Sequence, residues 1–262
     1  MTYSEGFEYV RKIKYTIEPR TDTHYSMEII KKGKKKIAVF AFRETITVRN
    51  WIDNFMFKKK PYKGMPFVWK AHRGFVRKWK SIEDEVLQFM KDNNPDEVIG
   101  LGYSQGAAIN LFCAEDLWFH YPALRGSKMN FYSYATPRAF SWNAPMVRWN
   151  DVVRLSMRRD IVTKLPFGIM GYKHVGHEIV IDDTGLSDTD IVDELCESGD
   201  AGVGDDSKGA SRGVSRGVGR GVSRGVGILH GYLKDFWGKL EKFIPTHKAH
   251  FPNVYSKYLA GL

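Results

Sequence analysis

A serine flanked by glycines, at the junction of two apolar segments, is the feature that most limits how this chain can fold. The pattern is Gly102-Tyr103-Ser104-Gln105-Gly106. A short apolar run over 97–101 precedes it, and a longer apolar segment over 107–119 follows it. Glycines at both ends permit a strand-to-helix turn so tight that a Cβ atom would clash with neighbouring backbone. The pattern therefore predicts a strand, a sharp turn that presents Ser104 as a nucleophile, and a helix.

The same pattern occurs three more times, around Ser211, Ser215 and Ser223. Those copies lie in a short Arg-Gly-Val repeat, with neither a strand-like segment before them nor a helix-like one after them. The context therefore favours Ser104 and rejects the other three. A serine that only caps a helix in a glycine turn is the structural alternative for Ser104.

Other apolar segments predict the rest of the fold. Residues 25–42 read as a hairpin, 75–90 have helical spacing, and 129–134 and 152–157 are further strand candidates. Strands that alternate with helices indicate an α/β fold, with a mostly parallel central sheet flanked by helices. We expect one catalytic domain over 1–262, since 43% hydrophobic residues suffice for a sizeable core.

A serine nucleophile needs a base and a carboxylate that orients the base. Asp160 directly follows the strand candidate 152–157, at the end where such sheets carry their active sites, whereas Asp151 precedes that strand. The alternative is that Asp160 is an exposed carboxylate that only pairs with Arg158 or Arg159.

The order of these and other segments resembles the class 3 lipase family over about residues 37–182 and again near the carboxyl terminus. The similar segments are Phe42-Arg43-Glu44-Thr45 with 48–53, His72-Arg73-Gly74-Phe75, Gly102–Gly106, Ala135-Thr136-Pro137-Arg138, Asp160-Ile161-Val162 and Tyr172–Glu178. Each motif is modest by itself, and the six in register form a strong signal.

The resemblance implies an α/β-hydrolase-like fold and an enzyme that hydrolyses carboxylic ester bonds of lipids, either acylglycerols or phospholipids, through an acyl-enzyme. It implies no metal and no cofactor. Ser104 and Asp160 take the nucleophile and acid positions, and the backbone N–H groups of Thr45 and Gln105, with the Thr45 hydroxyl, form the oxyanion hole. Losing one such donor typically lowers the rate by ~10²–10³.

The base is the least constrained residue of the triad, because five histidines follow Asp160. The family's catalytic histidine lies near the carboxyl terminus, with a tyrosine three or five residues later. His250, followed by Tyr255, fits this spacing, so we assign His250 as the base and keep His230 as the alternative. The resemblance gives His174 and His177 a structural role.

Residues 46–57 carry apolar side chains on one helical face, at Val48, Trp51, Ile52 and Phe55. Such a stripe ordinarily faces a core. The resemblance instead implies a lid, which either opens at a lipid interface or is short and permanently open. Lysines 58–60 and Lys63 follow it, and we expect them to meet anionic headgroups.

Three residues depart from the family pattern. Glu44 and Ala135 replace glycines, and Thr163 stands where proline is usual. An inward-pointing Glu44 carboxylate would oppose the oxyanion, so we expect this side chain to face away.

An insertion over about 183–227 differs in composition from the rest of the chain. Residues 182–206 contain ten acidic residues and no Lys or Arg, and four arginines follow at intervals of four from Arg212. We read the segment as a linker-like insertion. The alternative is a catalytically weak protein that binds membranes or nucleic acid through the basic repeat, although that repeat lacks the aromatic residues common in single-strand binders.

The formal charge of +10 favours an anionic partner. We expect a lipid ester substrate at a membrane or lipid-droplet interface and no nucleic acid partner. The sequence has no apolar run near 18 residues, no secretory signal and only two cysteines, Cys113 and Cys196, so we expect a cytoplasmic protein peripheral to membranes.

Overall fold

The computed structural model describes residues 1–43, 59–61, 69–181 and 252–259. The predicted lid, Thr45, the insertion with its serine repeats, and His230 and His250 lie outside these residues. By compactness the chain divides into one unit of Met1–Asp183 with Ala249–Leu262, and a second unit of Thr184–Lys248 that falls outside the described residues. Among the described helices, none is long and apolar enough to cross a membrane.

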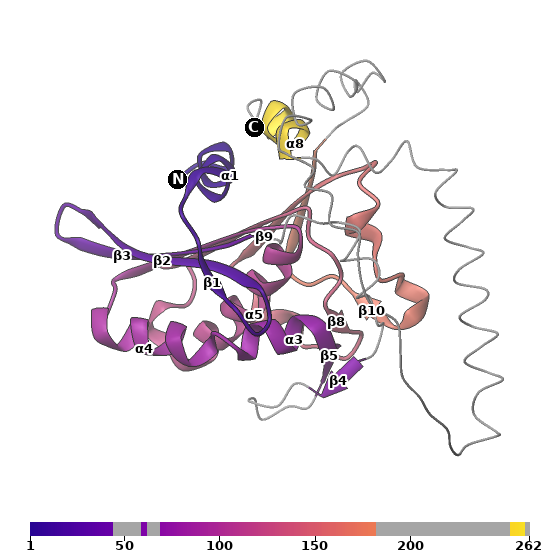
Figure 1. The fold of residues 1–262 in the computed structure, drawn as a ribbon, viewed down its shortest axis with the longest axis horizontal. Coiled ribbons are helices and arrows are strands. Elements are labelled where there is room, and N and C mark those ends of the chain that lie inside the picture. Colours follow the sequence, from indigo (N-terminus) through magenta and orange to yellow (C-terminus); the bar gives the residue numbers. More distant parts are fainter. Residues whose placement is uncertain (44–58, 62–68, 182–251, 260–262) are drawn as a thin grey trace, which may run out of the picture. The chain divides into compact units, whose positions relative to one another are not determined.

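The described residues form a central sheet of seven strands in the order β1-β2-β3-β6-β7-β9-β11 (Figure 1). The first three strands pair antiparallel, and the pairs from β3 to β11 are all parallel. The strands span Thr16–Glu18, Thr23–Lys32, Lys35–Arg43, Glu97–Tyr103, Met129–Tyr134, Val152–Met157 and His177–Ile181. The mostly parallel sheet predicted from the sequence is therefore confirmed.

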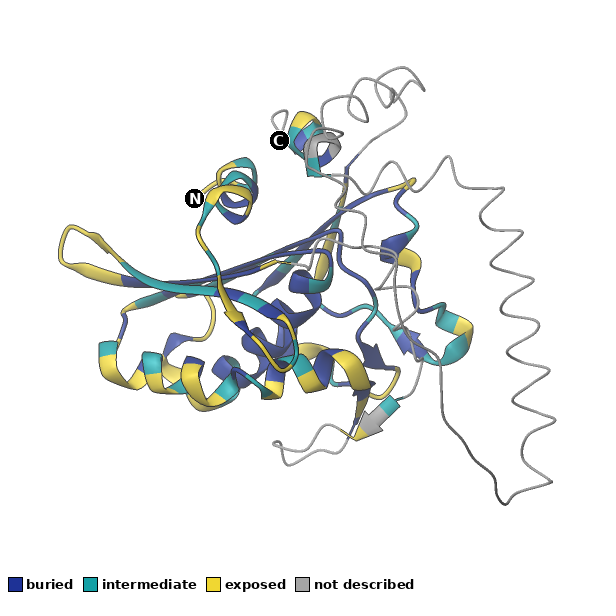
Figure 2. Cartoon of the chain, in the orientation of Figure 1, coloured by how far each residue is buried: buried dark blue, intermediate teal, exposed yellow. Residues whose placement is uncertain are grey.

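Helices cover both faces of this sheet. Helices α3 (Arg73–Lys80), α4 (Glu83–Asn93) and α5 (Gln105–His120) lie on one face. Helices α1 (Tyr3–Lys12) and α8 (Pro252–Leu259) lie together on the other (Figure 1). Residues 37–42 of β3 are all buried, because both faces of that strand are covered (Figure 2). This explains why the strand reads as a continuous apolar run rather than an alternating one.

Helix α5 is the central helix of the described fold, and its residues 106–117 are all buried. It packs against β3, β6, β7 and α3. Burial on every side explains its lack of a polar face. Its few polar side chains are held by specific partners: Nδ2 of Asn110 donates to Oγ of Ser133 at 2.9 Å.

The hairpin predicted over 25–42 is present as β2 and β3, with Lys32 opposite Lys35 at the turn. The single helix predicted over 75–90 is wrong, because α3 and α4 are separate helices with Ser81 and Ile82 between them. Oγ of Ser81 donates to the Lys78 carbonyl at 2.7 Å and lies 2.8 Å from Oγ1 of Thr21.

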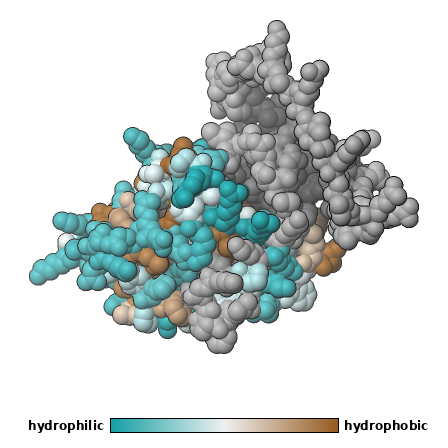
Figure 3. Space-filling view, turned by 60° about the horizontal axis from the view of Figure 1, so that its bottom comes forward, coloured by the Kyte–Doolittle hydropathy of each residue, from teal (hydrophilic) through white to brown (hydrophobic). Residues whose placement is uncertain are grey.

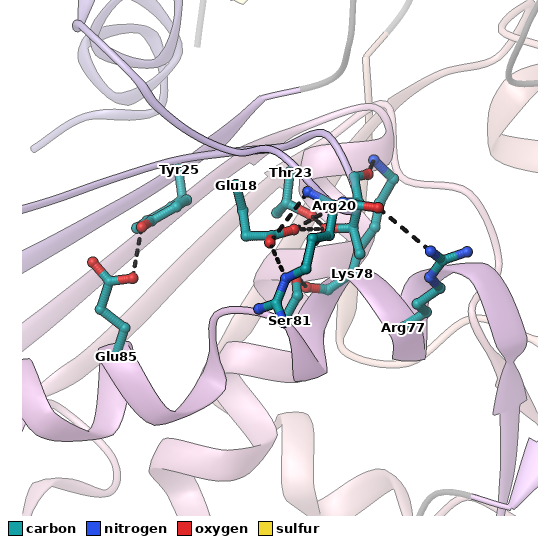
Figure 4. A network of polar contacts seen from close by, with 9 residues as sticks. Glu18, Arg20, Thr23, Tyr25, Arg77, Lys78, Ser81 and Glu85 are labelled. Carbon is teal, nitrogen blue, oxygen red and sulfur yellow. Dashed lines mark hydrogen bonds and ion pairs between the residues drawn. The ribbon is translucent and has the colours of Figure 1, made fainter.

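A polar network joins this break to the loop between β1 and β2 (Figure 4). Nζ of Lys78 donates to the backbone carbonyls of Thr21 and Asp22 at 2.6 and 2.7 Å. The Glu18 carboxylate accepts from Thr21 and from Nε of Arg20, and these hydrogen bonds lower the pKa of Glu18 to about 2. The break is thus in contact with residues some sixty positions earlier, and apolar spacing along the sequence does not reveal such contacts.

A second, antiparallel sheet of four short strands lies beside the main one among the described residues, in the order β10-β8-β5-β4. These strands span Tyr172–Lys173, Phe140–Ser141, Lys70–His72 and Lys59–Pro61. Each has two or three residues, which is too short for a period-two pattern to be recognised. Neither this sheet nor the capped helix α1 was predicted from the sequence.

Candidate active site

Ser104 lies on the turn between β6 and α5, as the sequence predicted. Its backbone has φ 55° and ψ −120°, an unusual conformation for a residue with a side chain. The turn is held by its backbone: the Ser104 N–H donates to the Tyr134 carbonyl at 2.9 Å, and the Ser104 carbonyl accepts from Ala107 N at 3.0 Å. The side chain is buried rather than open to solvent. A fixed, strained serine at a strand end is the arrangement of a nucleophile elbow.

The two glycines of the pattern are required by close backbone approach. A Cβ on Gly102 would lie 2.6 Å from the Gly106 carbonyl oxygen. A Cβ on Gly106 would lie 2.2 Å from the carbonyl oxygen of Phe42 and 2.6 Å from the nitrogen of Arg43. The absence of a side chain at Gly106 therefore allows the first turn of α5 to touch the end of β3.

The contact between α5 and β3 lies where the oxyanion hole is predicted. Gln105 is the first residue of α5, where backbone N–H groups have no acceptor within the helix. Strand β3 ends at Arg43, two residues before Thr45, which lies outside the described residues. The end of β3 and the start of α5 are therefore neighbours, as an oxyanion hole built from Thr45 and Gln105 would need.

Asp160 follows β9 at its carboxyl end and is fully buried. Its Oδ1 accepts from the Val162 N–H at 2.9 Å, and its backbone carbonyl accepts from the Thr163 hydroxyl at 2.8 Å. Proline, usual in the family at Thr163, could not donate this hydrogen bond. Arg158 and Arg159 are exposed, so Asp160 is not the exposed carboxylate that the alternative interpretation required.

Tyr255 on α8 is the partner of Asp160 that sequence reasoning missed. Its hydroxyl donates to Oδ2 of Asp160 at 2.8 Å and accepts from the Met157 N–H at 3.0 Å. The ring packs near those of Phe7 and Tyr103. Burial, followed by the charge of Asp160, raises the pKa of Tyr255 well above its ordinary value, so the hydroxyl remains a donor. The only sequence signal was its five-residue spacing from His250.

A carboxylate can accept about four hydrogen bonds, so those from Tyr255 and Val162 leave capacity for an imidazole N–H. His174 is engaged elsewhere, because its Nε2 donates to the Thr163 carbonyl at 2.7 Å. Burial lowers the pKa of His174 to about 3, helped by Arg154 and Arg138, so the ring is neutral at pH 7. His177 is exposed in β11. His250 and His230 lie outside the described residues, so the choice of base stays a prediction.

Arg138, in the segment after β7, ties that segment to the loop that follows Asp160. Its N–H donates to the Leu165 carbonyl at 2.7 Å, and its guanidinium donates to the carbonyls of Lys164 and Pro166. Lys59 reaches the same loop from β4, donating to the Met170 carbonyl at 2.6 Å. This ammonium is therefore engaged with the backbone, and its contact with anionic headgroups stays a prediction.

The family model described as Lipase (class 3) matches residues 39–170, half of the chain, including Ser104, Gln105 and Asp160. The chain is 29% identical over 208 residues to the secreted mono- and diacylglycerol lipase A of Penicillium cyclopium. That alignment covers 73% of this chain and 65% of the Penicillium protein, so the chain spans less than two thirds of that relative.

Solved structures share the fold. A triacylglycerol lipase whose catalytic centre is formed by a serine protease triad matches with a TM-score of 0.56 and 27% identity, over 64% of this chain and 65% of that one. A fungal lipase–inhibitor complex, presented as a model for interfacial activation, matches with a TM-score of 0.54 and 27% identity, over 63% and 64%. The α/β-hydrolase-like fold predicted from the sequence is confirmed.

Proposed function

The chain belongs to the class 3 lipase family, and from this we propose that it is a serine esterase that hydrolyses carboxylic ester bonds of lipids. The observation that carries the proposal is the pair of Ser104 and Asp160. A serine held at φ 55° follows β6, and a buried carboxylate follows β9. Both strands are parallel to β7, which lies between them, so both residues lie at the carboxyl edge of one sheet.

In the proposed reaction, Oγ of Ser104 attacks the ester carbonyl carbon while His250 accepts the hydroxyl proton. The negative charge on the tetrahedral oxygen is met by the N–H groups of Gln105 and Thr45 and by the Thr45 hydroxyl. The alcohol leaves with the proton returned by His250, which leaves an acyl group on Ser104. Water then attacks this acyl-enzyme by the same steps and releases the carboxylic acid.

Asp160 would hold the imidazole in the tautomer that accepts the serine proton and would stabilise the imidazolium that forms. Tyr255 and Val162 orient the carboxylate from two sides. Removal of such an orienting carboxylate typically lowers kcat by about 10⁴.

The proposed substrates are acylglycerols or phospholipids at a membrane or lipid-droplet interface. The relatives named above are a mono- and diacylglycerol lipase and a triacylglycerol lipase, which favours neutral acylglycerols. Preference for an anionic surface, and a cytoplasmic location peripheral to membranes, stay proposals that rest on the charge and composition of the sequence.

Hydrolysis of a soluble short-chain aryl ester, compared between wild type and Ser104→Ala, tests the function. We expect the variant to lose activity by several orders of magnitude and to keep its circular dichroism spectrum. The matched control replaces Ser211, Ser215 and Ser223 together with alanine, which removes the three other serines in the same pattern and should leave the rate near that of wild type. Retained turnover above a few per cent in Ser104→Ala would exclude Ser104 as the nucleophile.

A further inference from the structure

Hydrophilic side chains cover most of the described surface in the view of Figure 3, with hydrophobic ones in small groups between them. Among the described residues, eight large hydrophobic side chains are exposed. Two stand out because their exposure is high and their positions are close: Trp142, exposed by 64%, and Ile169, exposed by 97%. Isolated exposed hydrophobic residues are ordinary, but a close pair on one side of a site calls for an explanation.

The register of the small sheet brings these two residues together. Strand β10 pairs antiparallel with β8, with Tyr172 opposite Ser141. Continuing that register by one position sets Trp142 opposite Gly171, two residues after Ile169. A hydrogen bond fixes the arrangement: Nε1 of Trp142 donates to the Tyr172 carbonyl at 3.1 Å. The polar atom of the indole is thus satisfied within the protein, while most of its ring faces solvent.

Both residues belong to segments that leave the active-site edge of the main sheet. Trp142 follows the segment after β7, and Ile169 lies in η4 (Gly168–Met170), nine residues after Asp160. The hydrogen bonds of Arg138 to the carbonyls of Leu165 and Pro166 join the two segments. Since β6, β7 and β9 are parallel, Trp142 and Ile169 extend from the same edge that carries Ser104.

The loops that carry the pair are held by lysines. Nζ of Lys59 donates to the Met170 carbonyl and lies 4.7 Å from the centre of the Tyr172 ring. Nζ of Lys173 donates to the Ala144 carbonyl at 2.7 Å. Burial lowers the pKa of both lysines. The side chains of Trp142 and Ile169 therefore project to solvent from segments that hydrogen bonds hold in place.

The two segments that carry the pair contain no acidic residue. The sequence has no Asp or Glu from Arg138 to Asn150 and none from Ile161 to His177. In addition to the two engaged lysines, the exposed Lys164 lies five residues before Ile169. The boundary between lipid headgroups and acyl chains favours a particular combination of side chains. It consists of a tryptophan whose indole N–H is hydrogen-bonded, an aliphatic neighbour and nearby lysines.

We propose that Trp142 and Ile169 form a fixed anchor that inserts into a lipid surface containing anionic headgroups and holds the Ser104 edge of the sheet against it. The inference rests on the proposed function, because it supplies the contact through which a lipid ester would reach Ser104. The anchor consists of described residues alone.

Flotation with vesicles tests the anchor, with all variants built on Ser104→Ala so that no lipid is consumed. The vesicles are pure phosphatidylcholine, or phosphatidylcholine with 30% phosphatidylglycerol added as the anionic lipid. Trp142→Ser and Ile169→Ser should each lower the partition coefficient about tenfold, and the double variant about a hundredfold, since each removes one buried apolar side chain. The matched control is Ile17→Ser, an exposed isoleucine in β1, an edge strand of the main sheet, which should partition like its parent.

A second measurement separates the anchor from the catalytic proposal. With Ser104 intact, the double variant should hydrolyse a soluble short-chain ester at the wild-type rate but an ester presented in vesicles at least tenfold more slowly. Equal partitioning of the double variant and its parent would overturn the anchor and leave the function untouched. A change from dimer to monomer on sedimentation in Ile169→Ser would also overturn it, by assigning this surface to a second copy of the chain. Because Ile169 is almost fully exposed, its replacement does not put folding at risk.

Discussion

The hydroxyl of Tyr255 joins the Asp160 carboxylate to the backbone of Met157, 98 positions earlier in the chain than the tyrosine. It donates to Oδ2 of Asp160 at 2.8 Å and accepts from the Met157 N–H at 3.0 Å. The end of β9 and helix α8 are thus joined directly, and the same hydroxyl holds the residue that the sequence assigns as the acid. This relationship makes the carboxyl-terminal helix part of the candidate active site.

Tyr255→Phe should leave the Met157 N–H and one Asp160 oxygen without this partner. We expect a loss of about 1–3 kcal/mol in the free energy of unfolding, from the unsatisfied buried groups. Looser orientation of the carboxylate should lower kcat for a soluble ester about tenfold, which corresponds to about 1.4 kcal/mol of transition-state stabilisation. Urea denaturation and steady-state kinetics measure the two effects.

The control for this variant is Tyr134→Phe. Tyr134 is equally buried, and its hydroxyl donates to the Tyr3 carbonyl at 2.6 Å rather than to Asp160. It should lose stability without a matching loss in kcat. If both variants had the same kcat, Tyr255 would have only a packing role.

Gly106→Ala should damage both fold and activity, because the new Cβ would meet the carbonyl oxygen of Phe42 at 2.2 Å. Backbone on both sides prevents an easy adjustment, so we expect destabilisation by about 3 kcal/mol. That would lower the melting temperature by roughly 6–12 °C. Gly168→Ala is the control, since its Cβ meets nothing within 4 Å. Similar melting temperatures for both variants would contradict the close approach of α5 to β3.

His250→Ala should lower turnover by several orders of magnitude if this residue is the base. His230→Ala should cost little, because the glycine-rich sequence before it offers few side chains to hold an imidazole in place. His174→Ala removes the hydrogen bond that the imidazole donates to the Thr163 carbonyl, which should lower the free energy of unfolding by about 1 kcal/mol. The variant should keep most of its turnover. An active His250→Ala together with an inactive His230→Ala would move the base to the edge of the repeat.

Buried His72 should make the fold sensitive to acid. Burial lowers the pKa of its imidazole to about 4, whereas an unfolded chain has a pKa near 6.5. Between these values the unfolded state binds the extra proton, so this contribution to stability is present above pH 6.5 and lost as the pH falls to 4. The loss amounts to roughly 3 kcal/mol.

His72→Phe keeps a ring against Phe75 and Tyr172 but cannot titrate. The slope of unfolding free energy against pH should therefore flatten between pH 6.5 and 4, as measured by urea denaturation at several pH values. His174 still titrates in the variant and preserves part of the slope. An unchanged slope would mean that His72 is as accessible to protons in the folded state as in the unfolded chain.

The sequence by itself determined the features that depend on short stretches of chain. The place of Ser104 on a strand-to-helix turn was predictable because an apolar strand, two glycines and a helix adjoin within about twenty residues. The position of Asp160 just after a strand was predictable for the same reason, and its role as the acid stays a prediction. The β2–β3 hairpin, the parallel sheet and the α/β-hydrolase-like class follow from local apolar patterns and from motifs in a fixed order.

Only the tertiary structure decided the features that depend on residues far apart. At the break between α3 and α4, Ser81 contacts Thr21, sixty positions earlier, and apolar spacing runs through the break without interruption. The Tyr255–Asp160 hydrogen bond joins residues 95 positions apart. The exposed pair of Trp142 and Ile169 becomes visible only when the two-residue strands β8 and β10 set its register. The physical reason is the same in each case: short elements have almost no propensity of their own, and their positions are set by the partners they find in the folded chain.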